Sequence, residues 1–156
     1  MKLKIIAVGG RMPRWVCDGF DEYSKRMPPE LKVQLIEIAL GKRGKNPDIE
    51  RAIRQEGKAM MEQVKPDDLV VALEVDGKPM TTEQLADRLG NWQMEGRDVC
   101  LLVGGPDGNA PECKARANLK WSLSSLTLPH PLVRIMLAEQ IYRAWSINAN
   151  HPYHRA

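Results

Sequence analysis

The chain has 156 residues, of which 43% are hydrophobic and 28% are charged, a composition that excludes a disordered chain and is typical of a folded globular protein. This length fits one domain, which we expect to span residues 1–156. The 23 Lys and Arg residues exceed the 20 Asp and Glu residues by three, which permits a nucleic-acid partner without requiring one.

The cysteines and the apolar runs exclude further classes. Cys17, Cys100 and Cys113 are an odd number at wide spacing, which argues against a secreted disulfide framework and a zinc motif. The histidines lack the spacing and the acidic or thiol partners of a metal site, so we expect no metal. No apolar run reaches the length of a membrane span, and we expect a cytoplasmic protein with no membrane contact.

The first half of the chain alternates between strand and helix patterns. An apolar run over residues 3–8 predicts a buried strand, and apolar residues at helical spacing over 12–23 predict a helix. Alternating residues predict a second strand over 31–39. A helix follows over residues 49–64, for which Asn46 is the expected N-cap.

The pattern continues after that helix. Residues 69–73 predict a third strand, and residues 76–79 predict a turn. Thr81 and Gln84 have the spacing of a capping box at the start of the next helix, and Gly96 is the expected C-cap.

The last third of the chain completes the alternation. Residues 99–103 predict a fourth strand, residues 112–119 a short helix, residues 121–128 a last strand or extended loop, and residues 131–147 a long apolar helix. Strands that alternate with helices predict an α/β protein whose mostly parallel sheet is flanked by helices.

Ligands of parallel sheets bind outside the carboxyl ends of the strands. This rule brings together Leu73, the Gly104-Gly105 loop and the segment near Leu128 as the candidate site. The glycines would let a ligand approach the backbone closely, although the same residues also suit an ordinary tight turn. The loop has neither the lysine of a phosphate-binding P-loop nor the glycine spacing of a dinucleotide-binding fold, which disfavours a phosphate-binding enzyme.

The last helix is apolar over most of its circumference, so more than one neighbour must cover it. One layer is the sheet, and we expect the second to be another copy of the chain, with a helix sandwiched within one chain as the alternative. Lys42, Arg43 and Lys45 form a basic loop that suits RNA phosphates, although such a loop is often simply solvated. The polar tail offers a base-stacking ring, imidazoles and a guanidinium, or is a frayed terminus.

Four segments together resemble the ribosomal RNA large subunit methyltransferase H family of the SPOUT superfamily. They are GKRGKN at 41–46, LVGGPDG at 102–108, SLSSLTLPHPLVR at 122–134 and NHPYHR at 150–155. The resemblance extends over essentially the whole chain. It implies a SPOUT fold with a deep C-terminal trefoil knot, a homodimer, and transfer of a methyl group from S-adenosylmethionine. The substrate it implies is N3 of a pseudouridine in the helix 69 loop of 23S rRNA, in assembled ribosomes.

The resemblance also implies roles for individual residues. The cofactor-binding positions are Leu73, Gly104, Gly105, Leu123, Ser124, Ser125, Leu126, Thr127 and Leu128. The candidates that promote loss of the N3 proton are His154, Tyr153, Arg155 and Arg143, with the base itself left open. We expect the tail to act across the dimer, and Lys42, Arg43 and Lys45 to contact RNA. A ribosome-binding factor without catalysis is the rival interpretation, and it would not bind the cofactor.

Overall fold

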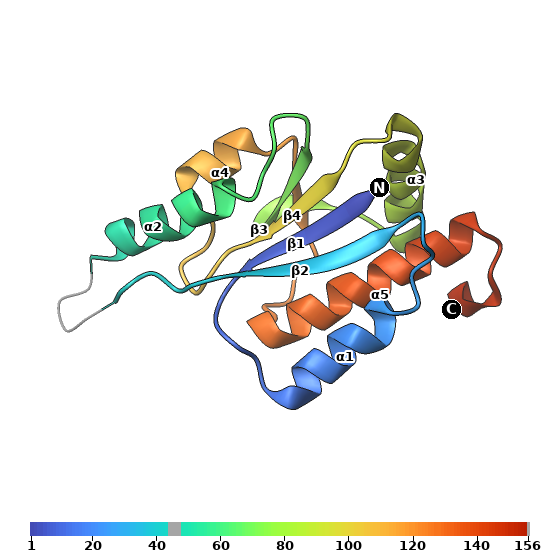
Figure 1. The fold of residues 1–156 in the computed structure, drawn as a ribbon, viewed down its shortest axis with the longest axis horizontal. Helices are drawn as coiled ribbons and strands as arrows, with labels where there is room; N and C mark the ends of the chain where they lie inside the picture. The colour runs from blue at the N-terminus through green and yellow to red at the C-terminus, as the bar shows by residue number, and fades with distance from the viewer. Residues whose placement is uncertain (44–47, 156) are drawn as a thin grey trace.

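The computed structural model describes residues 1–43 and 48–155, in which helices cover both faces of one sheet (Figure 1). All five strands are parallel, in the order β2-β1-β4-β3-β5, which confirms the predicted fold class. The strands are β1 (Lys2–Val8), β2 (Lys32–Ile38), β3 (Leu69–Pro79), β4 (Val99–Val103) and β5 (Leu119–Ser122). The helices are α1 (Arg14–Ser24), α2 (Ile49–Met61), α3 (Thr82–Glu95), α4 (Pro111–Arg116), α5 (His130–Asn148) and the 3-10 turn η1 (Pro152–His154).

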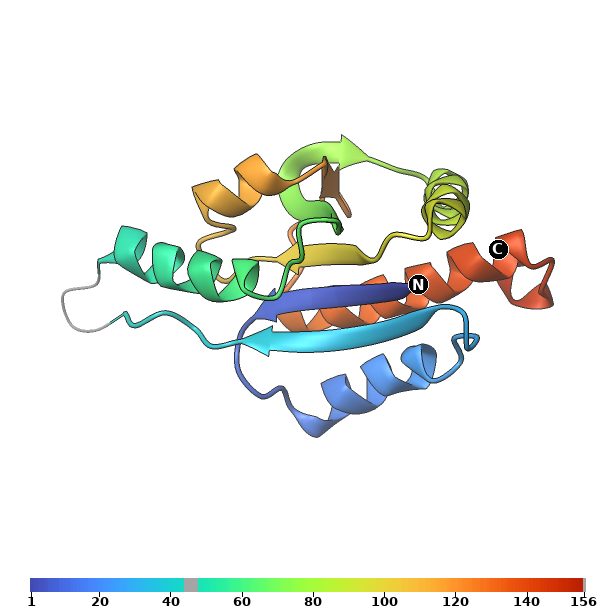
Figure 2. The same ribbon diagram turned by 45° about the horizontal axis from the view of Figure 1, so that its top comes forward.

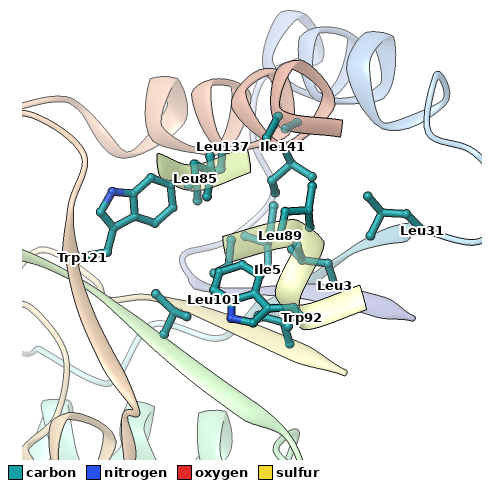
Figure 3. Close-up of a cluster of buried hydrophobic side chains, with 14 of the residues drawn as sticks. Leu3, Ile5, Leu31, Leu85, Leu89, Trp92, Leu101, Trp121, Leu137 and Ile141 are labelled. Atoms are coloured by element: carbon teal, nitrogen blue, oxygen red, sulfur yellow. The ribbon is translucent and has the colours of Figure 1, made fainter. Parts of the chain in front are cut away.

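The two faces of the sheet bury two separate cores because successive side chains of a strand point to opposite sides. In β1, Leu3 and Ile5 face the larger core, which α1, α3 and α5 cover. Ile6 and Val8 face the smaller core, which α2 and α4 cover. Figure 2 shows these layers from a second direction, and Figure 3 shows Leu137 and Ile141 of α5 directed into the larger core.

The strand order creates a crevice between β1 and β4. From β1 the chain passes through α1 to β2, which lies toward one edge in the strand order. From β4 it passes through α4 to β5, which lies toward the other edge. The two crossovers therefore diverge at the carboxyl ends of these neighbouring strands, where ligands of open parallel sheets bind.

The predicted turn at residues 76–79 is wrong, because β3 continues to Pro79. Leu73 pairs with Trp121 of β5, and Lys78 pairs with Trp121 again, so residues 74–77 bulge out between two short paired segments. Gly77 lies directly against the backbone of β5, where a Cβ atom would come within 2.8 Å of Trp121. This glycine therefore permits a close approach of two strands rather than a reversal of the chain.

The helix ends test the predicted caps. Thr81 and Gln84 form the expected capping box, and Gly96 ends α3 in the left-handed conformation at φ +70°. The N-cap of α2 is Asp48, whose carboxylate accepts a hydrogen bond from the Arg51 amide at 3.0 Å. The prediction of Asn46 as N-cap is therefore wrong, and Asn46 itself lies outside the described residues.

After β4 the elements occur in the predicted order, but the predicted bounds are partly wrong, because the helix expected over 112–119 ends at Arg116 and β5 begins at Leu119. α4 spans six residues, β5 ends at Ser122, and residues 123–129 form an extended loop that leads into α5. Strand order does not determine threading, so the trefoil knot and the single domain over residues 1–156 stay predictions. A search of the described residues found no helix with the length and hydropathy of a membrane span.

Candidate functional site

A cavity of about 600 Å³ opens at the carboxyl edge of the sheet. Its walls come from the ends of β1, β3, β4 and β5, from the loop before α5, and from the first turn of α5. Eight of the nine predicted cofactor positions line it, namely Leu73, Gly104, Gly105, Leu123, Ser124, Leu126, Thr127 and Leu128. Ser125 is exposed and does not line it. The structure thus brings three segments that are distant in sequence into one site.

The glycine loop forms one wall with its bare backbone. A Cβ atom on Gly104 would lie 2.5 Å from the carbonyl carbon of Gly108 and 2.6 Å from the Asn109 nitrogen. Gly108 has φ +86°, and its amide donates a hydrogen bond to the Gly105 carbonyl at 3.0 Å. Backbone packing of this kind excludes any side chain at residue 104, so the glycine is required by geometry rather than by flexibility.

Asn109 is a structural residue of the site that the sequence reasoning missed. Its buried side-chain amide donates to the Leu73 carbonyl at 3.2 Å and to the Leu102 carbonyl at 3.3 Å. It therefore ties the end of β3 to the end of β4 beside the cavity. An asparagine directly after a glycine-rich turn was the available sequence signal.

The loop over residues 123–128 presents open backbone to the cavity. Within the described chain, no backbone–backbone hydrogen bond involves these six residues. Two serines shape the loop instead: Ser122 Oγ donates to the Ser124 carbonyl, and Ser124 Oγ accepts from the Leu126 amide at 2.9 Å. The remaining amides and carbonyls are available to a ligand with a hydrogen-bonding edge.

Apolar side chains surround the mouth of the cavity. Leu40, Val75 and Leu126 line it and are 50%, 87% and 74% exposed. Exposed hydrophobic side chains that gather at one opening are typical of a binding site.

The electrostatics of the cavity favour a neutral or cationic ligand. Among the described residues that line it, Glu74 is the one acidic residue, His130 is the one other titratable residue, and no Lys or Arg is present. Burial, the positive charge of Arg134 and a backbone hydrogen bond with Gly104 act on His130, and the first two lower its pKa. Its Nε2 accepts a hydrogen bond from Arg134 Nε at 3.2 Å, so the imidazole is held neutral.

The candidate catalytic residues lie elsewhere, in a group that we name the tail cluster: Glu139, Arg143, Tyr153, His154 and Arg155. The Tyr153 hydroxyl donates to Glu139 Oε1 at 2.9 Å, and Arg143 Nε donates to the same oxygen at 2.8 Å. The Arg143 guanidinium also lies 4.9 Å from the centre of the Tyr153 ring. Glu139, which sequence reasoning missed, therefore organises this group, and burial together with its hydrogen bond raises the pKa of Tyr153 to about 12.

The tail cluster and the cavity lie at different positions along α5. His130 in the first turn of this helix lines the cavity, whereas Tyr153 of η1 folds back onto Glu139 in the middle of the helix. At the rise of an α-helix, Glu139 and Arg143 are about 13 Å and about 20 Å along the axis from His130. Figures 1 and 2 both show the C-terminus at the far end of α5 from the carboxyl ends of the strands. Within one chain, the structure does not bring the candidate catalytic residues to the cavity.

The residues of the basic loop also have different environments. Lys42 is exposed, whereas Arg43 is bound by two carboxylates, with Glu56 at 2.7 Å and Asp107 at 3.0 Å. Arg43 thereby links α2 to the glycine loop, and Lys45 lies outside the described residues. A search of the described chain found no group of three residues suited to hold a metal ion.

Comparison with known proteins adds a family and close relatives. The model of a family described as predicted SPOUT methyltransferase matches residues 1–154. Three relatives named ribosomal RNA large subunit methyltransferase H, from Ectopseudomonas mendocina, Pseudomonas putida and Pseudomonas aeruginosa, are each 59% identical to this chain. Each similarity covers 99% of this chain and 100% of the relative.

Proposed function

Because the chain belongs to the SPOUT methyltransferase family, we propose that it transfers the methyl group of S-adenosylmethionine to N3 of a pseudouridine in the helix 69 loop of 23S rRNA. The similarity to these relatives covers their full length, and their name, ribosomal RNA large subunit methyltransferase H, supports an rRNA of the large subunit as substrate. The finer target, in assembled ribosomes, follows from the resemblance of the four motifs. Such a substrate implies that the enzyme works in the cytoplasm.

The observation that carries the proposal is the fit of the strand-end cavity to an adenosyl cofactor. The open backbone of residues 123–128 offers amides and carbonyls to the hydrogen-bonding edge of an adenine. The bare backbone of Gly104 and Gly105 permits close approach. Leu73, Leu126 and Leu128 provide the apolar wall that suits a sulfonium, and the lack of Lys and Arg among the described lining residues disfavours a nucleotide phosphate.

When bound, S-adenosylmethionine supplies an activated methyl group for in-line displacement. The cavity residues hold and orient it, and positioning of this kind contributes about 7–11 kcal/mol in favourable reactions. Leu73 pairs with Trp121 of β5 and its carbonyl accepts from Asn109, and Gly104 packs against the backbone of Gly108 and Asn109, so the fold itself holds these two positions in place. The neutral His130 adds no positive charge to repel a sulfonium.

The tail cluster has the groups that activation of an imide nitrogen requires. N3 of the base must lose its proton as it attacks. His154 is suited to receive that proton, and Tyr153, whose raised pKa keeps its hydroxyl protonated, is suited to relay it to the Glu139 carboxylate. Arg143 and Arg155 are suited to stabilise the negative charge that develops on the neighbouring base oxygens. Glu139 holds Arg143 and Tyr153 in a fixed relation. We leave the base open between His154 and Tyr153.

A homodimer would unite the two halves of this site. Glu139 and Arg143 of one chain lie about 13 Å and about 20 Å along α5 from His130 of their own cavity, so a second chain with α5 in the opposite direction would bring its tail to that cavity. Exposed apolar side chains support such an interface, with Trp15 of α1 57% and Leu132 of α5 40% exposed. We therefore propose that each active site combines a cavity from one protomer with the tail of its partner.

The basic loop is our candidate for part of the ribosome contact. Lys42 is exposed and suited to bind a phosphate directly, and Lys45 is proposed for the same role. Arg43 was predicted for this role too, and its two ion pairs point to support of the loop beside the cavity.

The decisive experiment combines the protein with radiolabelled S-adenosylmethionine and assembled ribosomes that lack the target methyl group. We expect label in large-subunit rRNA, and we expect it to vanish when the target pseudouridine is replaced by uridine. Cofactor binding without label would contradict the substrate but keep the fold and the cavity. Neither binding nor label would contradict the proposal and favour a ribosome-binding factor.

A further inference from the structure

Glu74 is the acidic residue of the cavity, and neither the motifs nor the resemblance assigns it a role. It follows Leu73 directly, at the point where β3 leaves its register with β5. The bulge over residues 74–77 carries Glu74 and Val75 into the wall of the cavity, whereas Asp76 on the same bulge does not line it. A bulge commonly redirects a side chain toward a site in this manner.

The carboxyl group of Glu74 is incompletely satisfied. Its Oε1 atom is buried, and the described residues supply no hydrogen-bond partner for that oxygen. Buried carboxyl oxygens without a donor are rare because losing their hydration is unfavourable. Burial accordingly raises the pKa of Glu74, while the positive charge of Lys114, the side-chain amide of Asn109 and the positive charge of Lys120 act in the opposite direction.

Neighbouring cations do not account for this group. No salt bridge within 4.0 Å joins Glu74 to any described residue, so the two lysines act on it only through space. The nearby amide of Asn109 is already directed at the Leu73 and Leu102 carbonyls. The carboxyl group thus borders an otherwise largely apolar cavity, and its Oε1 atom lacks a hydrogen-bond donor among the described residues.

We propose that Glu74 is a cofactor-binding residue whose carboxylate accepts hydrogen bonds from an N–H or O–H donor of the adenosyl cofactor. This inference rests on the proposed function and deepens it. Three parts of S-adenosylmethionine have such donors, namely the ammonium group of its methionine part, the hydroxyl groups of its ribose and the amino group of its adenine. Each of them is suited to complete the carboxylate.

Calorimetric titration of the full-length protein with S-adenosylmethionine tests the proposal. In the Glu74→Gln variant, which keeps the shape and removes the charge, we expect the Kd to rise about tenfold or more. The matched control is Asp76→Asn, which removes a negative charge from the same bulge outside the cavity and should change the Kd by less than about threefold. An unchanged Kd for Glu74→Gln, or an equal rise for both variants, would overturn the proposal.

Two further measurements separate binding from structure and identify the donor. The midpoint of thermal unfolding of ligand-free Glu74→Gln should equal or exceed that of the wild type, because an unsatisfied buried charge is removed, and a lower midpoint would indicate a structural role and overturn the proposal. Methylthioadenosine retains the ribose but lacks the ammonium group. It also retains the adenine amino group, so an equal loss of its affinity identifies a donor of the nucleoside part, and an unchanged affinity identifies the ammonium group.

The failure of this inference is distinguishable from the failure of the proposed function. If the wild-type protein binds no S-adenosylmethionine, the proposed function fails and this inference fails with it. If wild type and Glu74→Gln bind it equally well, the inference alone fails.

Discussion

The strand-end cavity and the tail cluster differ in the chemical groups that form them. Backbone and apolar side chains form the cavity, whose one imidazole is already engaged by Arg134. The tail cluster consists of a carboxylate, guanidinium groups, a phenol and an imidazole, packed on the last turns of α5. The cavity is suited to hold a ligand, and the tail cluster is suited to move a proton. The two regions lie at different positions along α5.

This difference teaches that α5 has two functional ends. Its first turn lines the cavity, and its second half, from Glu139 to Arg143 and beyond, carries the tail cluster. An antiparallel pair of such helices presents the second end of one chain to the first end of the other. The following predictions separate the effects of changes in the cavity from those of changes in the tail cluster and in the basic loop.

The largest effect is expected in the cavity, for Gly104→Ala. The new Cβ would meet backbone atoms of Gly108 and Asn109 at 2.5–2.8 Å, so the glycine loop must move. We expect S-adenosylmethionine affinity, measured by calorimetry, to fall about a hundredfold or more, with loss of methyl transfer. Gly10→Ala is the matched control because its Cβ would meet nothing within 4 Å. Comparable binding by the two variants would contradict this account of the loop.

Removal of the tail should leave cofactor binding intact and reduce methyl transfer. A variant that ends at Ile147 retains every residue that lines the cavity and loses the candidate proton-transfer groups. We expect unchanged cofactor affinity and a fall in methyl transfer to ribosomes of about a hundredfold or more. Transfer at the normal rate would show that the tail takes no part in catalysis.

Mixed dimers test whether the two regions come from different chains. A purified dimer of one Gly104→Ala chain and one tail-less chain has a single complete site, so about half of wild-type activity is expected although each variant alone is inactive. An inactive mixed dimer would show that cavity and tail act within one chain.

A smaller effect is expected for Glu139→Gln, within the tail cluster. The variant weakens the hold on Arg143 and Tyr153, and we expect kcat to fall roughly tenfold, or about 1.4 kcal/mol, with unchanged cofactor affinity. Because burial and the Glu139 carboxylate raise the pKa of Tyr153 to about 12, loss of this negative charge should lower that pKa. Tyrosinate absorbance should therefore appear at lower pH, and Tyr153→Phe identifies which tyrosine contributes. An unchanged titration would contradict the coupling.

The smallest effect is expected for Lys42→Ala, in the exposed basic loop. Loss of one phosphate contact should raise the KM for ribosomes about threefold and leave cofactor affinity unchanged. Lys65→Ala, which removes an exposed lysine at the opposite edge of the sheet, is the control. Altered cofactor binding in Lys42→Ala would contradict the assignment of this loop to the ribosome.

The strands and most caps could be predicted from the sequence because their signals are local. The apolar run at 99–103, the capping box of Thr81 and the C-cap Gly96 depend on period, spacing and conformational preference, and the structure confirms them. Predictions were wrong where contacts with a segment distant in sequence determine the local conformation. Residues 76–79 have the composition of a turn, yet pairing with β5 keeps them in a strand.

The sequence by itself determined the fold class and the three segments that meet at the carboxyl edge of the sheet, because parallel strands end at a common edge. Only the tertiary structure decided how single side chains are used. It bound Arg43 to Glu56 and Asp107, directed the Asn109 amide at the Leu73 and Leu102 carbonyls, and left the Oε1 atom of Glu74 without a donor. It also put Glu139 and Arg143 of the tail cluster in the second half of α5, away from the cavity. Such relations depend on distances between residues remote in sequence, which no local pattern contains.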